Sequence, residues 1–166
     1  MTDNSLAGKT CLVTGGAGGL GKAIATKYLE ASANVVICDV NEERLQQASA
    51  ELSSKGTLKT IQADITKPDA VQRLIDEIVK DFQKLDVLVN NAGIMDHFDP
   101  VGDLDAGLWD KVIAVNLTAP YLLSKLAVNN MLEQANPNGC IFNIVSVAGK
   151  AGWSGGIYPF TDLLPI

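Results

Sequence analysis

The chain has 166 residues, 47% of them hydrophobic, and a formal net charge of −6 without a basic patch. This length and composition predict one globular domain over residues 1–166 and argue against nucleic acid or a membrane as a partner. Residues 1–9 lack the apolar core of a signal peptide, and no apolar run reaches the roughly 18 residues of a membrane-spanning helix, so we expect a cytoplasmic protein. The three cysteines have neither disulfide nor metal-ligand spacing, which predicts no metal site and cysteines packed in the core.

The first predicted strand, residues 10–13, runs directly into a loop with five glycines within residues 15–21. After Gly21, apolar residues recur at three- and four-residue spacings, which predicts a helix. A strand, a glycine loop and a helix can bind a phosphate, because backbone N–H groups at a helix start have no partner inside the helix. The spacing Gly16-x-Gly18-x-x-Gly21 fits the general dinucleotide-binding pattern. The alternative is a glycine-rich turn that binds no ligand.

The second predicted strand, residues 34–39, is apolar almost throughout and ends in Asp39. Such a run predicts a strand that is covered on both faces, as in parallel sheets. Asp39 lies near the place where a dinucleotide-binding unit holds the adenosine ribose with an acid. Its carboxylate would repel a 2′-phosphate, and no Arg or Lys lies in the glycine loop or directly after Asp39 to offset this. The pattern therefore predicts NAD over NADP, with a plain strand-end or helix-cap carboxylate as the alternative.

Three further strands and three helical regions follow. A helix over 41–52 is expected to be capped by Asn41 or Asp39. The later predicted strands cover 57–63, 85–89 and 140–145. A helix with a regular apolar stripe begins near Pro68, and a long helical region covers 106–134, with a possible break near Pro120.

Polar residues or glycine follow all five predicted strands, at Gly15, Asp39, Asp64, Asn90 and Ser146. The carboxyl ends of parallel strands share one edge of the sheet, and ligands bind outside that edge. These features predict an α/β fold with a Rossmann-type, doubly wound parallel sheet of about five strands in the order 3-2-1-4-5. Asp64 on its own is interpreted as a turn residue.

A family resemblance rests on five motifs in the expected order, each at a predicted strand end, among them the following two. Thr14-Gly15-x-x-x-Gly19-x-Gly21 and Asn90-Asn91-Ala92-Gly93 resemble the TGxxxGxG and NNAG motifs of the short-chain dehydrogenase/reductase family, and the similarity extends over about residues 5–156. The resemblance implies an NAD-dependent oxidoreductase that transfers a hydride between NAD(H) and a small secondary alcohol or ketone, commonly as a homo-oligomer. The cofactor-binding residues that it implies are Gly15, Gly18, Gly19, Leu20, Gly21, Asp39, Asp64, Ile65, Asn91, Ala92 and Gly93.

The resemblance also implies catalytic residues, which are Asn116, Ser146 and Tyr158. An Asn within an apolar helix favours a local backbone bond or a water-filled kink, and in the family such an Asn holds a proton-relay water. In the family the catalytic Tyr is followed four residues later by a Lys that lowers its pKa.

The sequence departs from the family at this point. Pro159 stands where the catalytic Tyr is expected, and Asp162 stands four residues after Tyr158. An acid at 162 would raise the tyrosine pKa, which is the opposite of what the chemistry needs. Residues 157–166 are therefore interpreted as an atypical tail, the family's last strands are expected to be absent, and activity is expected to be impaired. The alternative function is a non-catalytic dinucleotide-binding module or an inactive truncated product.

Overall fold

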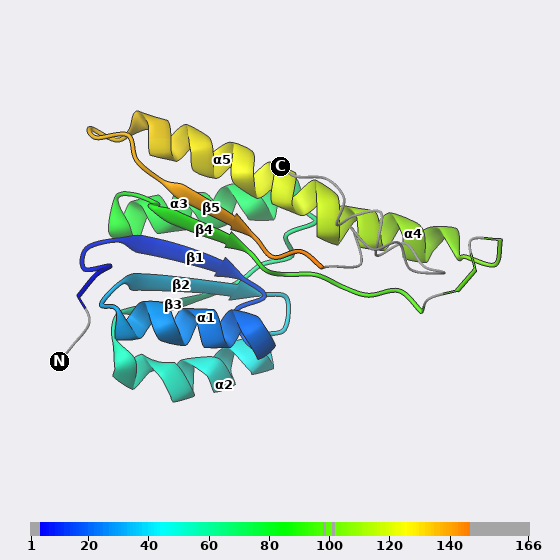
Figure 1. Ribbon diagram of the computed structural model, residues 1–166, viewed down its shortest axis with the longest axis horizontal. Helices are drawn as coiled ribbons and strands as arrows, with labels where there is room; N and C mark the ends of the chain where they lie inside the picture. The colour runs from blue at the N-terminus through cyan, green and yellow to red at the C-terminus, as the bar shows by residue number, and fades with distance from the viewer. Residues whose placement is uncertain (1–3, 98, 101, 147–166) are drawn as a thin grey trace.

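The computed structural model describes residues 4–97, 99–100 and 102–146, and within them five strands form one sheet. The strand order is β3-β2-β1-β4-β5, and every pair of neighbours is parallel, as the arrows in Figure 1 show. The predicted doubly wound order is therefore confirmed. The strands are β1 (Thr10–Thr14), β2 (Asn34–Asp39), β3 (Leu58–Gln62), β4 (Val87–Asn90) and β5 (Cys140–Asn143).

Helices cover both faces of this sheet. Figure 1 shows α1 and α2 on one face and α3 and α5 on the other. The α-helices are α1 (Gly19–Glu30), α2 (Glu42–Leu52), α3 (Pro68–Phe82), α4 (Ala106–Ile113) and α5 (Ala119–Glu133). A short 3₁₀ helix, Ser53–Lys55, follows α2, and a π-helical segment, Ala114–Thr118, joins α4 to α5.

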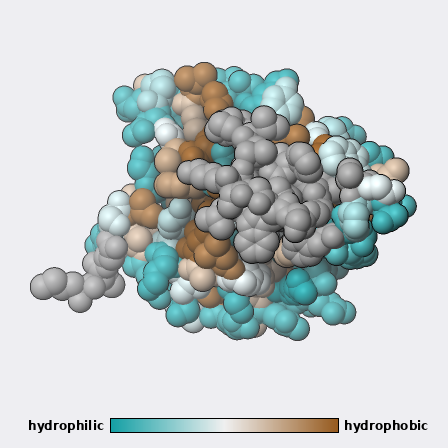
Figure 2. Space-filling view, turned by 45° about the vertical axis from the view of Figure 1, so that its right-hand side comes forward, coloured by the Kyte–Doolittle hydropathy of each residue, from teal (hydrophilic) through white to brown (hydrophobic). Residues whose placement is uncertain are grey.

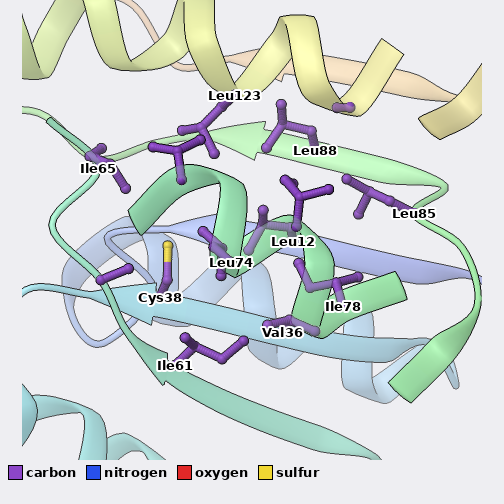
Figure 3. Close-up of a cluster of buried hydrophobic side chains, with 14 of the residues drawn as sticks. Leu12, Val36, Cys38, Ile61, Ile65, Leu74, Ile78, Leu85, Leu88 and Leu123 are labelled. Atoms are coloured by element: carbon purple, nitrogen blue, oxygen red, sulfur yellow. The ribbon is translucent and has the colours of Figure 1, made fainter. Parts of the chain in front are cut away.

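The core has two halves because side chains alternate between the two faces of each strand. On β1, Leu12 belongs to the cluster on the side of α3 and α5, whereas Cys11 and Val13 belong to the cluster on the side of α1 and α2. Figure 3 shows the first cluster, in which Leu74 and Ile78 of α3 meet the sheet. Covering on both faces explains why β1 and β2 are apolar almost throughout.

The start of α2 settles an alternative that the sequence left open. The side chain of Asn41 accepts a hydrogen bond of 2.9 Å from the backbone N–H of Arg44, so Asn41 is the N-cap. The carboxylate of Asp39 instead accepts a hydrogen bond of 3.0 Å from the N–H of Asn41. Asp39 thus stays beside the edge of the sheet, where it is available to a ligand.

The helical region after residue 106 differs from its prediction in two ways. The helix continues from Ala106 to Glu133 without a break, and its irregular part is the π-helical segment Ala114–Thr118, shortly before Pro120. By length and composition alone the whole run Ala106–Glu133 could cross a membrane, so the expectation that no stretch could do so is wrong. In the fold, Leu123 and Ala127 are fully buried against the sheet and α3, as in a core helix.

The cysteine prediction is correct for two residues and wrong for the third. Cys11 and Cys38 are buried, and burial raises the pKa of each thiol to about 12. Cys140 is exposed, because it begins β5, which pairs with β4 alone among the described strands. The strand predicted over residues 140–145 is shorter in the structure, where β5 ends at Asn143 and the side chain of Phe142 is exposed.

Candidate functional site: a dinucleotide cleft

A cleft of about 570 Å³ lies where the carboxyl ends of the first four strands meet. The residues that follow these strands line it, as the sequence predicted for a ligand site. Nine of the predicted cofactor-binding residues line the cleft, namely Gly15, Gly18, Gly19, Asp39, Asp64, Ile65, Asn91, Ala92 and Gly93. Leu20 and Gly21 do not line it.

The glycine loop packs tightly against the segment after β4 at Gly15 and Gly21, and it is open at Gly18 and Gly19. Gly15 has φ +61°, and a Cβ at Gly21 would lie only 2.6 Å from Nδ2 of Asn91, so neither position admits a side chain. A Cβ at Gly18 or Gly19 would meet nothing within 4 Å. The backbone of these two residues is therefore bare toward the cleft, which fits a pyrophosphate that approaches a helix start.

Thr14 joins the glycine loop to the segment after β4. Its buried hydroxyl accepts hydrogen bonds of 3.0 Å from the backbone N–H groups of Asn91 and Ala92 and donates one of 3.3 Å to the carbonyl of Val89. The side chain of Asn91 returns a hydrogen bond of 2.9 Å to the carbonyl of Thr14. These side-chain to backbone hydrogen bonds join the glycine loop to the segment after β4, and both segments line the cleft.

Asn90, at the end of β4, stabilises the sheet next to the cleft. The residue is buried, and its Nδ2 donates to Oδ1 of Asn143 at 2.8 Å and to Oγ of Ser124 at 3.2 Å. These bonds tie β4 to β5 and to α5. The role in stabilising the sheet that the family resemblance implies for the first Asn of the motif agrees with this geometry.

Two carboxylates face the cleft from neighbouring strands. Asp39 ends β2, and Asp64 follows β3. Asp64 accepts hydrogen bonds from the hydroxyl of Thr66 at 2.6 Å and from its N–H at 3.0 Å, and the hydroxyl bond first of all holds the pKa of Asp64 below its usual value. Asp64 is therefore both the turn residue expected from the sequence and part of the cleft wall.

Asn116 lies in the π-helical segment, and its side chain bonds to the backbone of Ile94. Its Oδ1 accepts from the backbone N–H of Ile94, and its Nδ2 donates to the carbonyl of the same residue, both at 2.9 Å. The side-chain amide of Asn116 thus satisfies both the N–H and the carbonyl of Ile94, a residue 22 positions away in the sequence. Ile94 lines the cleft, so Asn116 supports the cleft wall from behind.

The other two predicted catalytic residues lie at or beyond the end of the described chain. Ser146 is partly buried and follows β5 at the same edge of the sheet as the cleft, but it does not line the cleft. Tyr158 lies outside the described residues.

Sequence reasoning missed two cations of the cleft, Arg44 and Lys111. Arg44 lies in the first turn of α2, five residues after Asp39, and Lys111 lies on α4. Arg44 is not directly adjacent to Asp39 in the sequence, but the turn through Asn41 brings the start of α2 back to the cleft. The position of Lys111 depends on how α4 packs, and no local pattern reveals it.

Fold and site together define a dinucleotide-binding protein of the Rossmann class. The model of the short chain dehydrogenase family matches residues 9–158. The chain therefore belongs to the short-chain dehydrogenase/reductase family, whose members are oxidoreductases. The short chain dehydrogenase/reductase dpfgG of Gibberella zeae is 63% identical over 157 residues, which are 95% of this chain and 58% of that protein, so the chain spans little more than half of this relative.

Solved structures agree with this assignment. An NAD⁺-bound xylitol dehydrogenase has a TM-score of 0.89 and 33% identity over 95% of this chain and 60% of its own. A metagenomic short-chain oxidoreductase in complex with NADP has a TM-score of 0.89 and 34% identity over 95% of this chain and 72% of its own. The neighbours thus include both cofactors, and the fold binds a nicotinamide dinucleotide.

Proposed function

We propose that this chain binds NAD in the cleft and serves hydride transfer between NAD(H) and a small secondary alcohol or ketone. One observation carries the proposal: the cleft joins the bare backbone of Gly18 and Gly19 to the carboxylate of Asp39. The glycine loop suits a pyrophosphate, and the carboxylate suits ribose hydroxyls while it repels a 2′-phosphate. When bound, NAD supplies a hydride acceptor.

The proposed roles of the catalytic residues follow from the family resemblance. Ser146 would orient the oxygen of the substrate, and Tyr158 would exchange a proton with it. A free tyrosine has a pKa of about 10, so a neighbouring cation is needed to favour the phenolate near neutral pH. Asn116 would contribute by holding Ile94 and thereby the wall beside the reacting groups.

Calorimetric titration with NAD and NADP tests the cofactor proposal. We expect the unmutated chain to bind NAD more tightly, and we expect the double variant Asp39→Ala/Val40→Arg to lose or reverse that preference. Asp103→Ala removes an exposed acid outside the cleft and should leave both affinities unchanged. Equal affinity of the unmutated chain for the two cofactors would refute the preference for NAD.

A non-catalytic dinucleotide-binding module is the second candidate. The sequence favours it because Pro159 and Asp162 replace the groups that would activate a tyrosine. General acid–base groups contribute typically about 10²- to 10⁴-fold, so under this second candidate alcohol oxidation is absent or severely reduced. NADH formation with a panel of secondary alcohols measures this, and robust turnover would exclude the second candidate. A family-like tail with Tyr-x-x-x-Lys, grafted after Gly156, should restore activity.

A further inference from the structure

The loop between α5 and β5 contains the one Asn-Gly dipeptide of the chain, Asn138-Gly139. Both residues are exposed and belong to neither a helix nor a strand. Among the residues that the structure describes, the N–H of Gly139 has no acceptor and Asn138 makes no hydrogen bond. Neither burial nor a hydrogen bond therefore keeps the side-chain amide of Asn138 away from the backbone nitrogen that follows it.

The packing of this loop favours glycine at position 139. A Cβ at Gly139 would collide with Sδ of Met131, a buried residue of α5. Glycine has no side chain that could obstruct an approach to its nitrogen, and its backbone adopts many conformations. The same residue that lets the loop pass Met131 thus leaves its own nitrogen accessible to the amide of Asn138.

We propose that Asn138 is a site of spontaneous deamidation, which loosens the start of β5. The backbone nitrogen of Gly139 attacks Cγ of Asn138, so that a new N–C bond closes a succinimide ring and the Cγ–Nδ2 bond breaks. Nδ2 leaves as ammonia with the proton of the Gly139 amide. Water then opens the ring at either of its carbonyl groups, which leaves an aspartyl or an isoaspartyl residue. The reaction needs no reactant besides water.

The isoaspartyl product affects the sheet because its main chain runs through the former side chain and gains a carbon atom. The N–H of Cys140 donates to the carbonyl of Asp86 at 2.9 Å, at the start of the pairing between β4 and β5. Gly139 packs against Met131, so the added length should displace the start of β5. The hydrogen bond of Cys140 should then weaken, whereas the N–H of Ile144, which donates to the end of β4, should keep its acceptor.

Peptide mass spectrometry of the full chain, aged in water labelled with heavy oxygen, tests the chemistry. We expect the label to enter at Asn138, in both aspartyl and isoaspartyl products, and to enter faster at mildly alkaline than at neutral pH, because the attack removes the proton of the Gly139 amide. Asn136 is the control within the same exposed loop, since Pro137 has no N–H to lose and should block ring closure. Asn138→Gln should slow the conversion at least tenfold.

Hydrogen exchange followed by NMR tests the effect on β5. Exchange at Cys140 should be at least twofold faster in the isoaspartyl fraction, without a change at Ile144. Asn138→Asp carries the new charge on an ordinary backbone and should leave both rates unchanged. An Asn138 that stays intact in the folded chain, whether or not it converts in urea, would overturn the inference. Equal exchange at Cys140 in the fresh chain and the isoaspartyl fraction would overturn it as well.

Discussion

Two residues of the first strand show how single side chains hold the cleft in place. Thr14 is 1% exposed and uses its one hydroxyl for three backbone partners, so the glycine loop and the segment after β4 move together. At the other end of β1, the buried carboxylate of Asp86 accepts a hydrogen bond of 2.8 Å from the N–H of Thr10. Lys9 and Lys84 contact the same carboxylate at 3.0 and 3.1 Å.

Asp86 should make the stability of the chain depend on pH. Burial alone would raise the pKa of Asp86, but the bond from Thr10 and the two ammonium groups outweigh burial and hold the pKa below its usual value. A lowered pKa contributes stability above the unfolded pKa of about 3.9, and this is lost as the pH falls through the folded pKa. Asp86→Asn should therefore cost about 1–3 kcal/mol at pH 7 and progressively less below about pH 4.

Urea unfolding from pH 7 to pH 2.5 measures this difference. Asp103→Asn, in an exposed loop, is the control and should follow the unmutated chain at every pH. A penalty for Asp86→Asn that is constant over the whole pH range would show that the charge of Asp86 has no part in stability.

At the scale of the element, the irregular helix around Asn116 is the feature that shapes one wall of the cleft. Extra residues in a π-helical turn let a helix present a side chain that the regular spacing would turn away, and such segments are frequent at functional sites. Here the turn presents the amide of Asn116 to the backbone of Ile94.

Asn116→Leu should make the backbone around Ile94 more mobile. The substitution keeps the approximate size of the side chain but removes both hydrogen bonds, each of which contributes about 0.5–1.5 kcal/mol. The amide of Ile94 should then exchange its hydrogen faster, because Oδ1 of Asn116 is its acceptor. Hydrogen exchange followed by NMR measures this directly. Asn129→Leu, an exposed position on α5, is the control, and unchanged exchange at Ile94 in Asn116→Leu would contradict the prediction.

The elements differ in how well the sequence predicted them, for physical reasons. The strands and the glycine loop carry their signal locally, as apolar runs that end in glycine or polar residues. Their order is the one that doubly wound dinucleotide-binding sheets share. The partner of Asn116 lies 22 residues away, and no local pattern encodes such a pair. Exposure of Cys140 likewise depends on which elements cover β5, which the apolar run alone does not reveal.

At the scale of the whole molecule, apolar surface remains uncovered on the side of β5 that faces α1. Phe142 and Ile144 are 48% and 43% exposed. They line a groove of about 370 Å³ with side chains of α1, among them Leu20 and Ile24. Figure 2 shows hydrophobic surface gathered in a band on one face of the molecule. In the described part of the sheet, β5 also has a hydrogen-bonded neighbour on one side only.

These features predict that the chain associates with itself or has low solubility. An apolar strand at a sheet edge without charge or proline offers unpaired N–H and C=O groups and uncovered side chains to a second chain. The double variant Phe142→Thr/Ile144→Thr keeps β-propensity but removes much of the apolar surface, so it should move the molecular mass in size-exclusion chromatography with light scattering toward that of a monomer. Tyr121→Thr removes an exposed ring on α5, 51% accessible, and should have a smaller effect if the sheet edge is responsible. A soluble, cooperatively melting monomer of the unmutated chain at high concentration would show that this edge does not drive association.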